Sequence, residues 1–173
     1  MKDINVDIIG IDPGTNKCAI TKIDGTLTSP NFTSFLFDLT MEKKFKKDID
    51  LRFMTMLNNV LIHINNDIDL VCCEKPFGVV GNASILLEFF GAIHYFCLKR
   101  GIQFLSVPQT RLKKYATNNG RAEKSDMRLK LYKEFNLELS EDETDSFWIA
   151  HMGMTFLYGS SVKYREESVK KLR

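Results

Sequence analysis

The sequence is poor in the residues that build disulfides and zinc sites. It has four cysteines and three histidines in 173 residues, and no two cysteines form a CxxC pair. Cys72 and Cys73 are adjacent in an apolar run, so in a strand they point to opposite faces. We expect four reduced, buried thiols in a reducing compartment, and we interpret the histidines (His63, His94 and His151) as packing or surface residues.

Long hydrophobic runs are also missing. No uncharged apolar stretch reaches the roughly 18 residues that a membrane span needs, and the start, "MKDINVDI", lacks the basic and apolar regions of a signal peptide. No internal repeat, low-complexity tract or change in composition divides the chain. We therefore expect one domain over residues 1–173, with a cytoplasmic location and no membrane partner.

Hydrophobic periodicity predicts an α/β protein. Strands are expected at 6–11, 17–23, 31–39, 68–74 and 102–107. Helices are expected at 50–64, 83–100, 109–116, 124–135 and 142–158, the second between an Asn82 cap and a Gly101 stop. Three strands in a row indicate an antiparallel meander, and the later strand–helix alternation indicates a five-stranded mixed sheet flanked by helices. The ribonuclease H-like fold has this order.

Carboxylates stand at the ends of three predicted elements. Asp12 ends the first strand in "DIIGIDPGTN", Glu74 ends the fourth, and Asp142 and Asp145 begin the last long helix. If the first and fourth strands are neighbours, their acids come within reach, since paired strands lie about 4.8 Å apart. Residues three apart on a helix face the same way. Because Mg²⁺ prefers oxygen ligands, the pattern indicates a four-carboxylate site for two ions that hydrolyse a phosphodiester.

Each acid also has a simpler interpretation. Asp12 before Pro-Gly could be an ordinary turn residue. Acids in "EDETD" could serve only the helix dipole and the helix cap. Glu74 could pair with Lys75 at the surface.

Basic residues gather in the second half of the chain. Between residues 111 and 130, seven basic residues stand against two acidic ones. Such a stretch can contact DNA phosphates, or it can be a solvated helix face. In the loop after Glu74, Phe77 could insert between DNA bases or pack on its own domain.

Four motifs resemble, in order, those of RuvC-type Holliday junction resolvases of bacteria and phages. They are "IGIDPGTN", "CCEKPF", "RAEKSDM" and "DETDSFWIA", spanning about residues 12–150. The resemblance implies that Asp12, Glu74, Asp142 and Asp145 are catalytic ligands of two Mg²⁺ ions, for which Mn²⁺ substitutes. It implies that Lys124 is a catalytic lysine near the scissile phosphate.

The resemblance also implies a homodimer that binds branched DNA and nicks two opposed strands of a four-way junction. Phe77 would stack on a base at the junction centre. Further DNA contacts are expected from Lys75, Arg111, Lys113, Lys114 and Arg121. A bacterial cell or a phage-infected host is the expected setting.

Departures and alternatives stay open. Lys75 after Glu74, the bulky pair Phe147 and Trp148, and segment 38–50 differ from the family pattern. A broader flap-cutting or debranching nuclease and a non-catalytic junction binder fit some of the same residues. "DPGTN" also resembles the first phosphate loop of actin-like nucleotide-binding proteins, although a second such loop is missing.

Overall fold

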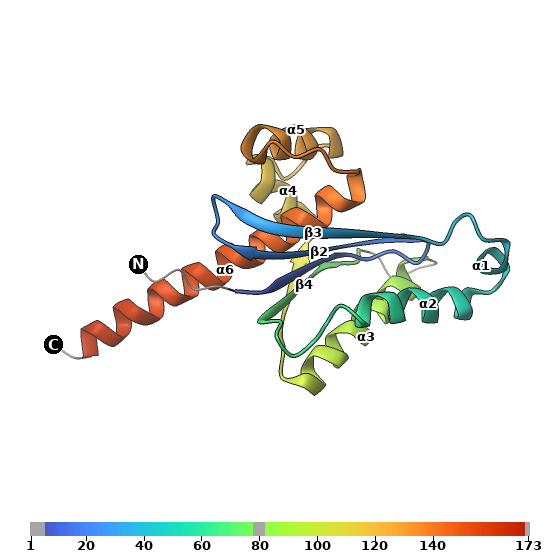
Figure 1. Ribbon diagram of the computed structural model, residues 1–173, viewed down its shortest axis with the longest axis horizontal. Coiled ribbons are helices and arrows are strands. Elements are labelled where there is room, and N and C mark those ends of the chain that lie inside the picture. The colour runs from blue at the N-terminus through green and yellow to red at the C-terminus, as the bar shows by residue number, and fades with distance from the viewer. Residues whose placement is uncertain (1–5, 78–81, 172–173) are drawn as a thin grey trace.

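Five strands form one open mixed sheet in the order β3-β2-β1-β4-β5 (Figure 1). The computed structural model describes residues 6–77 and 82–171, and the side chains of 46–47, 82–83 and 160–171 lie outside this description. The strands are β1 (Ile8–Asp12), β2 (Lys17–Gly25), β3 (Pro30–Asp38), β4 (Leu70–Lys75) and β5 (Gln103–Pro108). The antiparallel meander β1-β2-β3 and the parallel pairs β1-β4 and β4-β5 confirm the predicted mixed sheet.

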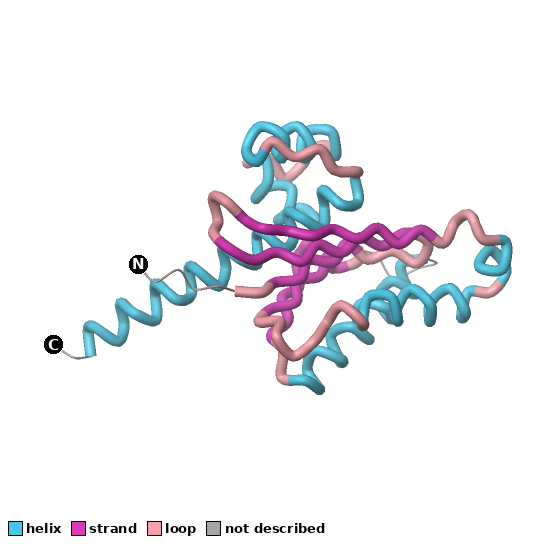
Figure 2. Tube along the Cα trace, viewed as in Figure 1, coloured by secondary structure: helices cyan, strands magenta, loops and turns pink. Residues whose placement is uncertain are grey.

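Six helices accompany the sheet within the described residues (Figure 2). They are α1 (Lys43–Lys47), α2 (Ile49–Leu61), α3 (Asn82–Arg100), α4 (Gln109–Thr117), α5 (Lys124–Phe135) and α6 (Glu141–Lys171). The short α1 was not predicted, and α6 is longer than the expected 142–158. Gly101 ends α3 with a φ of +69°, as expected of a glycine stop. The Asn82 side chain and the loop residues 78–81 lie outside the described parts.

The two faces of the sheet bury separate apolar clusters. One face packs on α2 and α3 and includes Cys73, while the other packs on α4, α5 and α6 and includes Cys72. All four cysteines are free and buried, so the prediction of opposite faces and reduced thiols is confirmed. In the described part of the chain, no helix has the length and hydropathy to cross a membrane.

Helix α6 lies directly against the middle of the sheet because two glycines leave room for it. A Cβ at Gly10 of β1 would lie 2.2 Å from the carbonyl oxygen of Ser146 and 2.4 Å from the amide nitrogen of Ala150. A Cβ at Gly153 of α6 would lie 2.3 Å from the Cys72 sulfur. No side chain fits at either position without moving the helix, so these glycines set the distance between α6 and β1.

We expect Gly10→Ala to lower the free energy of unfolding by about 3 kcal/mol, because the added methyl group meets helix backbone atoms that cannot rotate away. Gly159→Ala is the control, since nothing lies within 4 Å of a Cβ there and alanine is the better helix former. Denaturant unfolding measures both. Equal stability of the two variants would contradict the close packing of α6 on β1.

Candidate active site

Asp12 is the last residue of β1, and Glu74 is the last but one of the neighbouring strand β4. The parallel register pairs Ile11 of β1 with Cys73 of β4, so the next residue of each strand is one of the two acids. Asp12 follows Gly10 by two residues, and Glu74 follows Cys72 by two residues. Since residues two apart in a strand point to the same face, both acids lie on the face that contacts α6. Their side chains therefore belong to the α6 face, as the strand order expected from the sequence requires.

The first turn of α6 brings the other two acids to the same place. Ser140 and Glu143 cap the helix: the Ser140 amide and hydroxyl donate to the Glu143 carboxylate at 3.1 and 2.5 Å. Capping therefore does not require Asp142 or Asp145. Asp145 is buried and Asp142 is partly buried, which argues against the simpler interpretation of these two acids as helix caps.

A hydrogen-bonded chain of hydroxyls holds the residue next to Asp145. The Ser146 and Thr21 hydroxyls are 2.7 Å apart, and Thr21 is also 2.8 Å from the Ser34 hydroxyl on β3. Ser146 donates to the Glu143 carbonyl at 3.0 Å. These contacts tie α6 to β2 and β3 and fix the height of Asp145 above the sheet. Sequence reasoning missed them because single hydroxyls on three distant elements carry no local pattern.

Lys124 begins α5 and points its ammonium at the acids of α6. Its Nζ lies 3.5 Å from Asp142 Oδ1, 3.6 Å from Asp145 Oδ2 and 3.8 Å from Glu141 Oε2. Glu123 and Asp126 form the capping box of α5, which fixes the turn that presents this lysine. Lys124 was predicted to belong to the site from its motif, whereas its contact with Glu141 was not predicted.

Bulky aromatic residues hold α5 against α6. The Trp148 indole donates to the Met127 carbonyl at 3.2 Å, and Phe135 makes edge contacts with Phe147 and Trp148. The two large residues that depart from the family pattern thus fill the space between the helix that carries Lys124 and the helix that carries Asp142 and Asp145.

The carboxylates raise one another's pKa values. Burial raises the pKa of Asp12 well above its usual range, and the charges of Glu74, Asp145 and Asp142 raise it further. Burial raises the pKa of Glu74 to about 7, with Asp145 adding to the rise while Lys124 and Lys113 oppose it. Burial also raises the pKa of Asp145, against the lowering effect of Lys124. Four acids that influence each other in this way occupy one site.

Asp12 does not behave as an ordinary turn residue. Among the described residues, its carboxylate has no hydrogen-bond donor and no ion pair, although the residue is partly buried. The turn itself depends on Gly14, where a Cβ would lie 1.8 Å from the Lys17 carbonyl oxygen. Glu74 likewise makes no ion pair with Lys75 in the described part of the chain. Both carboxylates are therefore available to a cation.

The donor set fits a hard divalent cation, but the oxygens are not yet gathered around one point. All four predicted ligands are carboxylates, the ligands that Mg²⁺ prefers. Over residues 6–77 and 82–171, no three Asp, Glu, His or Cys side chains stand at metal-ligand spacing. In this arrangement the Lys124 ammonium contacts two of the four carboxylates, those of Asp142 and Asp145.

Three of the other predicted DNA-binding residues, Phe77, Lys75 and Lys113, lie near this end of the sheet. Phe77 is 98% exposed, three residues beyond Glu74. It lines a hollow of about 460 Å³ between the end of β4 and the start of α4, together with Lys75, Pro76, Pro108, Gln109 and Thr110. Lys113 lies near enough to Glu74 and Asp145 to lower their pKa values, against the dominant effect of burial. Four of the predicted DNA-binding residues, Lys75, Arg111, Lys114 and Arg121, are exposed and make no ion pair in the described chain.

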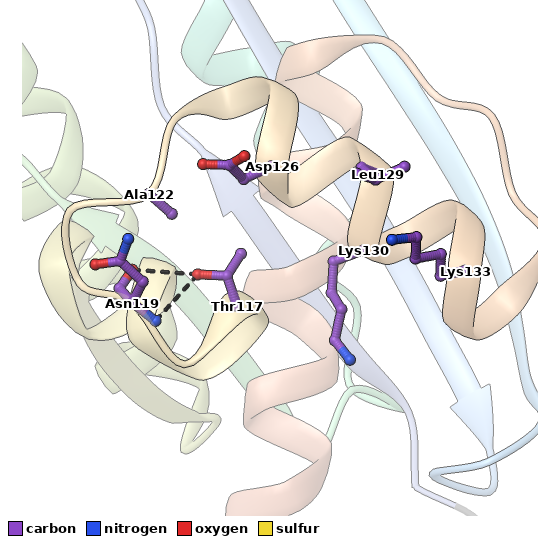
Figure 3. Close-up of a pocket in the computed structure, with 7 residues that line it drawn as sticks. All are labelled: Thr117, Asn119, Ala122, Asp126, Leu129, Lys130 and Lys133. Carbon is purple, nitrogen blue, oxygen red and sulfur yellow. Dashed lines mark hydrogen bonds between the residues drawn. The ribbon is translucent and has the colours of Figure 1, made fainter.

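A second hollow, between α4 and α5, lies apart from the acids (Figure 3). It has a volume of about 340 Å³ and is lined by Thr117, Asn119, Ala122, Asp126, Leu129, Lys130 and Lys133. Asp126 accepts the Glu123 amide, and Lys130 pairs with Glu134. Asp126 and Lys130 thus stabilise α5 itself. None of the four predicted metal ligands is among the residues that line this hollow.

The histidines are structural, as predicted. The Nδ1 atom of His151 is 2.7 Å from the Tyr115 hydroxyl and its Nε2 is 2.9 Å from the Leu27 carbonyl oxygen. His63 packs on Phe35, and His94 stacks on Phe104.

Comparison with known proteins defines the class of fold. No protein-family model and no curated protein sequence matches the chain. Among solved structures, the chain is similar to the RuvC of Thermus thermophilus, with a TM-score of 0.65 and 17% identity over 84% of this chain and 92% of that one. It is also similar to T. thermophilus RuvC in complex with a Holliday junction substrate, with a TM-score of 0.62 and 18% identity over 86% and 97%.

The chain therefore has a ribonuclease H-like fold, with an open five-stranded sheet flanked by helices. More narrowly, this is the fold of RuvC, which the four sequence motifs also resemble. At 17–18% identity this similarity shows the fold alone. The activity must be inferred from the side chains of this chain.

The raised pKa of Glu74 predicts a pH-dependent stability. Its pKa rises from the ordinary 4.5 to about 7 on folding, so stability present below pH 4.5 is lost as the pH rises to about 7. The free energy of unfolding of the unmodified protein should fall with pH in this range. Without divalent cations, we expect Glu74→Gln to reduce the steepness of that fall by up to about 1 kcal/mol per pH unit. Thermal unfolding in a chelating buffer measures it.

Glu88→Gln is the matched control, because Glu88 is exposed on α3. It should keep the pH dependence of the unmodified protein. If Glu74→Gln kept it too, the proposed burial of Glu74 among like charges would be wrong.

Proposed function

We propose that this protein is a metal-dependent, structure-selective endodeoxyribonuclease that resolves four-way DNA junctions. The observation that carries the proposal is the meeting of Asp12, Glu74, Asp142 and Asp145 at one end of a RuvC-type sheet. A protein that only binds DNA gains nothing from four carboxylates beside phosphates. A second glycine-rich phosphate loop of the actin-like kind is missing from the sequence, which disfavours a nucleotide-binding role.

The four carboxylates would hold two Mg²⁺ ions, which Mn²⁺ can replace. Such ions, when bound, activate a water molecule and stabilise the oxygen that leaves the phosphodiester. The protein's own part is to hold its acids in place: α6 is fixed on β1 at Gly10, and Ser146 is bonded to Thr21.

Lys124 has two roles in this proposal. Its ammonium balances part of the acidic charge of α6, at 3.5 Å from Asp142 and 3.6 Å from Asp145. When the acids bind cations, the same ammonium becomes available to a phosphate oxygen of the substrate, where it offsets negative charge that develops in the transition state. Its place at the start of α5 keeps it within reach of both.

Phe77 and the free basic residues would bind the branched part of the substrate. An exposed aromatic ring costs free energy in water, and insertion beside unpaired bases at a branch point would recover it. Lys75 and Lys113 flank the same end of the sheet and can contact the phosphates of the arms. RuvC in a Holliday junction complex shares this fold, which supports branched DNA as the partner.

Resolution by paired nicks requires two active sites, and the exposed side of α3 is suited to a second copy of the chain. Tyr95 and Leu98 are each 64% exposed there. Gly91 lies one turn before Tyr95 on the same side of α3. A Cβ added at Gly91 would have nothing within 4 Å, so another helix can approach closely there. We therefore propose a homodimer formed across α3.

We expect the protein to cut a labelled four-way junction in Mg²⁺ with symmetric paired nicks, and not in a chelator. Asp12→Asn should reduce the rate at least about a hundredfold while junction binding is retained, because it removes a metal ligand and leaves the basic surface intact. Gel analysis of both labelled strand pairs measures nicking, and titration measures binding.

Flap, fork and plain duplex substrates are the controls. Equal cutting of every branched substrate would retain the nuclease chemistry and favour a general debranching enzyme. Binding without cutting in any divalent metal would contradict an enzymatic function.

Phe77→Ala should slow cleavage of the four-way junction by about tenfold and that of a nicked flap much less, because only the junction centre offers a base step for the ring. Phe77→Tyr, which retains the ring, is the control. Single-turnover rates on both substrates measure the difference. A uniform loss on both substrates would argue against insertion at the branch point.

A further inference from the structure

Arg52 is a charged residue for which the described structure gives no partner. It lies in α2, it is only partly exposed, and its Nε is a buried atom without a hydrogen-bond partner. Within residues 6–77 and 82–171 its guanidinium makes no ion pair, no hydrogen bond and no ring contact. A bound anion would satisfy this buried donor.

Two acids that flank this region in the sequence, Asp38 and Asp48, already have partners. Asp38 pairs with Lys17 at 3.2 Å and accepts both the amide and the hydroxyl of Thr40, at 2.9 and 2.5 Å. The carboxylate of Asp48 caps α2 by accepting the Leu51 amide. Among the residues that the structure describes, no carboxylate therefore pairs with Arg52.

A hollow lies beside this arginine. It has a volume of about 260 Å³ and is lined by Asn16, Leu39, Thr40, Phe45 and Arg52. Since one water molecule occupies roughly 30 Å³ in the liquid, a phosphate group with bridging waters fits. Asn16 is exposed and offers an amide donor, so the hollow combines a guanidinium with hydrogen-bonding groups.

The hollow is at the same end of the sheet as the acids. Asn16 belongs to the turn that follows Asp12, and its carbonyl accepts the Leu39 amide at 2.9 Å, which joins the start of β2 to the end of β3. In Figure 1, α1 and the start of α2 lie beyond these strand ends. Leu39 and Phe45 belong to the cluster on the α2 face, whereas Asp12 shares the α6 face.

We propose that Arg52, with Asn16 and Thr40, binds a backbone phosphate of the DNA substrate at a distance from the scissile bond. This inference rests on the proposed nuclease function. The strands β1 and β3 are two strand spacings apart, about 10 Å. Because α2 covers the opposite face of the sheet from α6, the phosphate bound by Arg52 is a different one from the phosphate that is cleaved.

Arginine suits this role because its planar guanidinium donates two parallel hydrogen bonds to a phosphate. Arg52 would hold the DNA strand on the face of the sheet that α2 covers. Lys113 and Lys124 would hold it on the face that α6 covers. DNA would then be clamped from both faces of the sheet, with the acids between.

The test uses the full chain with Asp12→Asn, so that DNA is bound and not cut. Binding to a four-way junction and to a duplex is measured over a range of salt concentrations. Adding Arg52→Gln should weaken binding several-fold and reduce the slope of log affinity against log salt by about 1, as expected for the loss of one phosphate contact. Arg52→Lys, which retains the charge, should restore most of the slope.

Arg100→Gln is the matched control, because it removes the same charge from the C-terminal end of α3, where the guanidinium lies over Phe96. It should leave the slope unchanged. A structural role of Arg52 would instead lower the melting temperature of Arg52→Gln with no change of slope, and that result would overturn the proposal.

A neutral methylphosphonate, placed singly at two to five nucleotides from the cleavage site, locates the contact. One position should weaken binding of the Arg52 protein and have no further effect on Arg52→Gln. Additive losses at every position would overturn the proposal. If the Asp12→Asn protein bound junction and duplex with equal affinity, only the proposed selectivity for junctions would be contradicted. If it bound no DNA, both the proposed function and the role of Arg52 would be overturned.

Discussion

The direct packing of α6 on β1 is the contact on which the rest of the site depends. Gly10 permits the helix backbone to lie where a side chain would stand, and Gly153 does the same against β4. The first turn of α6 consequently lies over the ends of β1 and β4, where Asp12 and Glu74 are. A wider separation would leave two pairs of acids too far apart to share a cation.

Holding four carboxylates together has an electrostatic cost, which the surrounding structure bears. Burial and mutual repulsion raise the pKa values of Asp12 and Glu74, which shows how unfavourable the ionised cluster is without a cation. Lys124 offsets part of the cost, and it is held there by the aromatic contacts of Trp148 and Phe135 between α5 and α6. The apolar cluster on this face thus stabilises a site that is unfavourable by itself.

Cations of the protein lie on both sides of this acidic end. Lys113 and Lys124 belong to the face covered by α4, α5 and α6, and Arg52 belongs to the face covered by α2 and α3. Phe77 projects from the end of β4 into solvent. This end of the sheet has carboxylates at its centre and hydrogen-bond donors on both faces. Such an arrangement suits a phosphodiester chain that lies across it.

The α/β class, the antiparallel meander and the four acids as candidate ligands could be predicted from the sequence, because periodicity and short motifs are local. "DPGTN" and "DETDSFWIA" each mark an element end without reference to the rest of the chain. Contacts between distant elements could not be predicted this way. The bond of Thr21 with Ser146, the isolation of Arg52 and the distance of Lys124 from Asp145 were decided by tertiary packing, since each depends on how residues far apart in sequence are brought together.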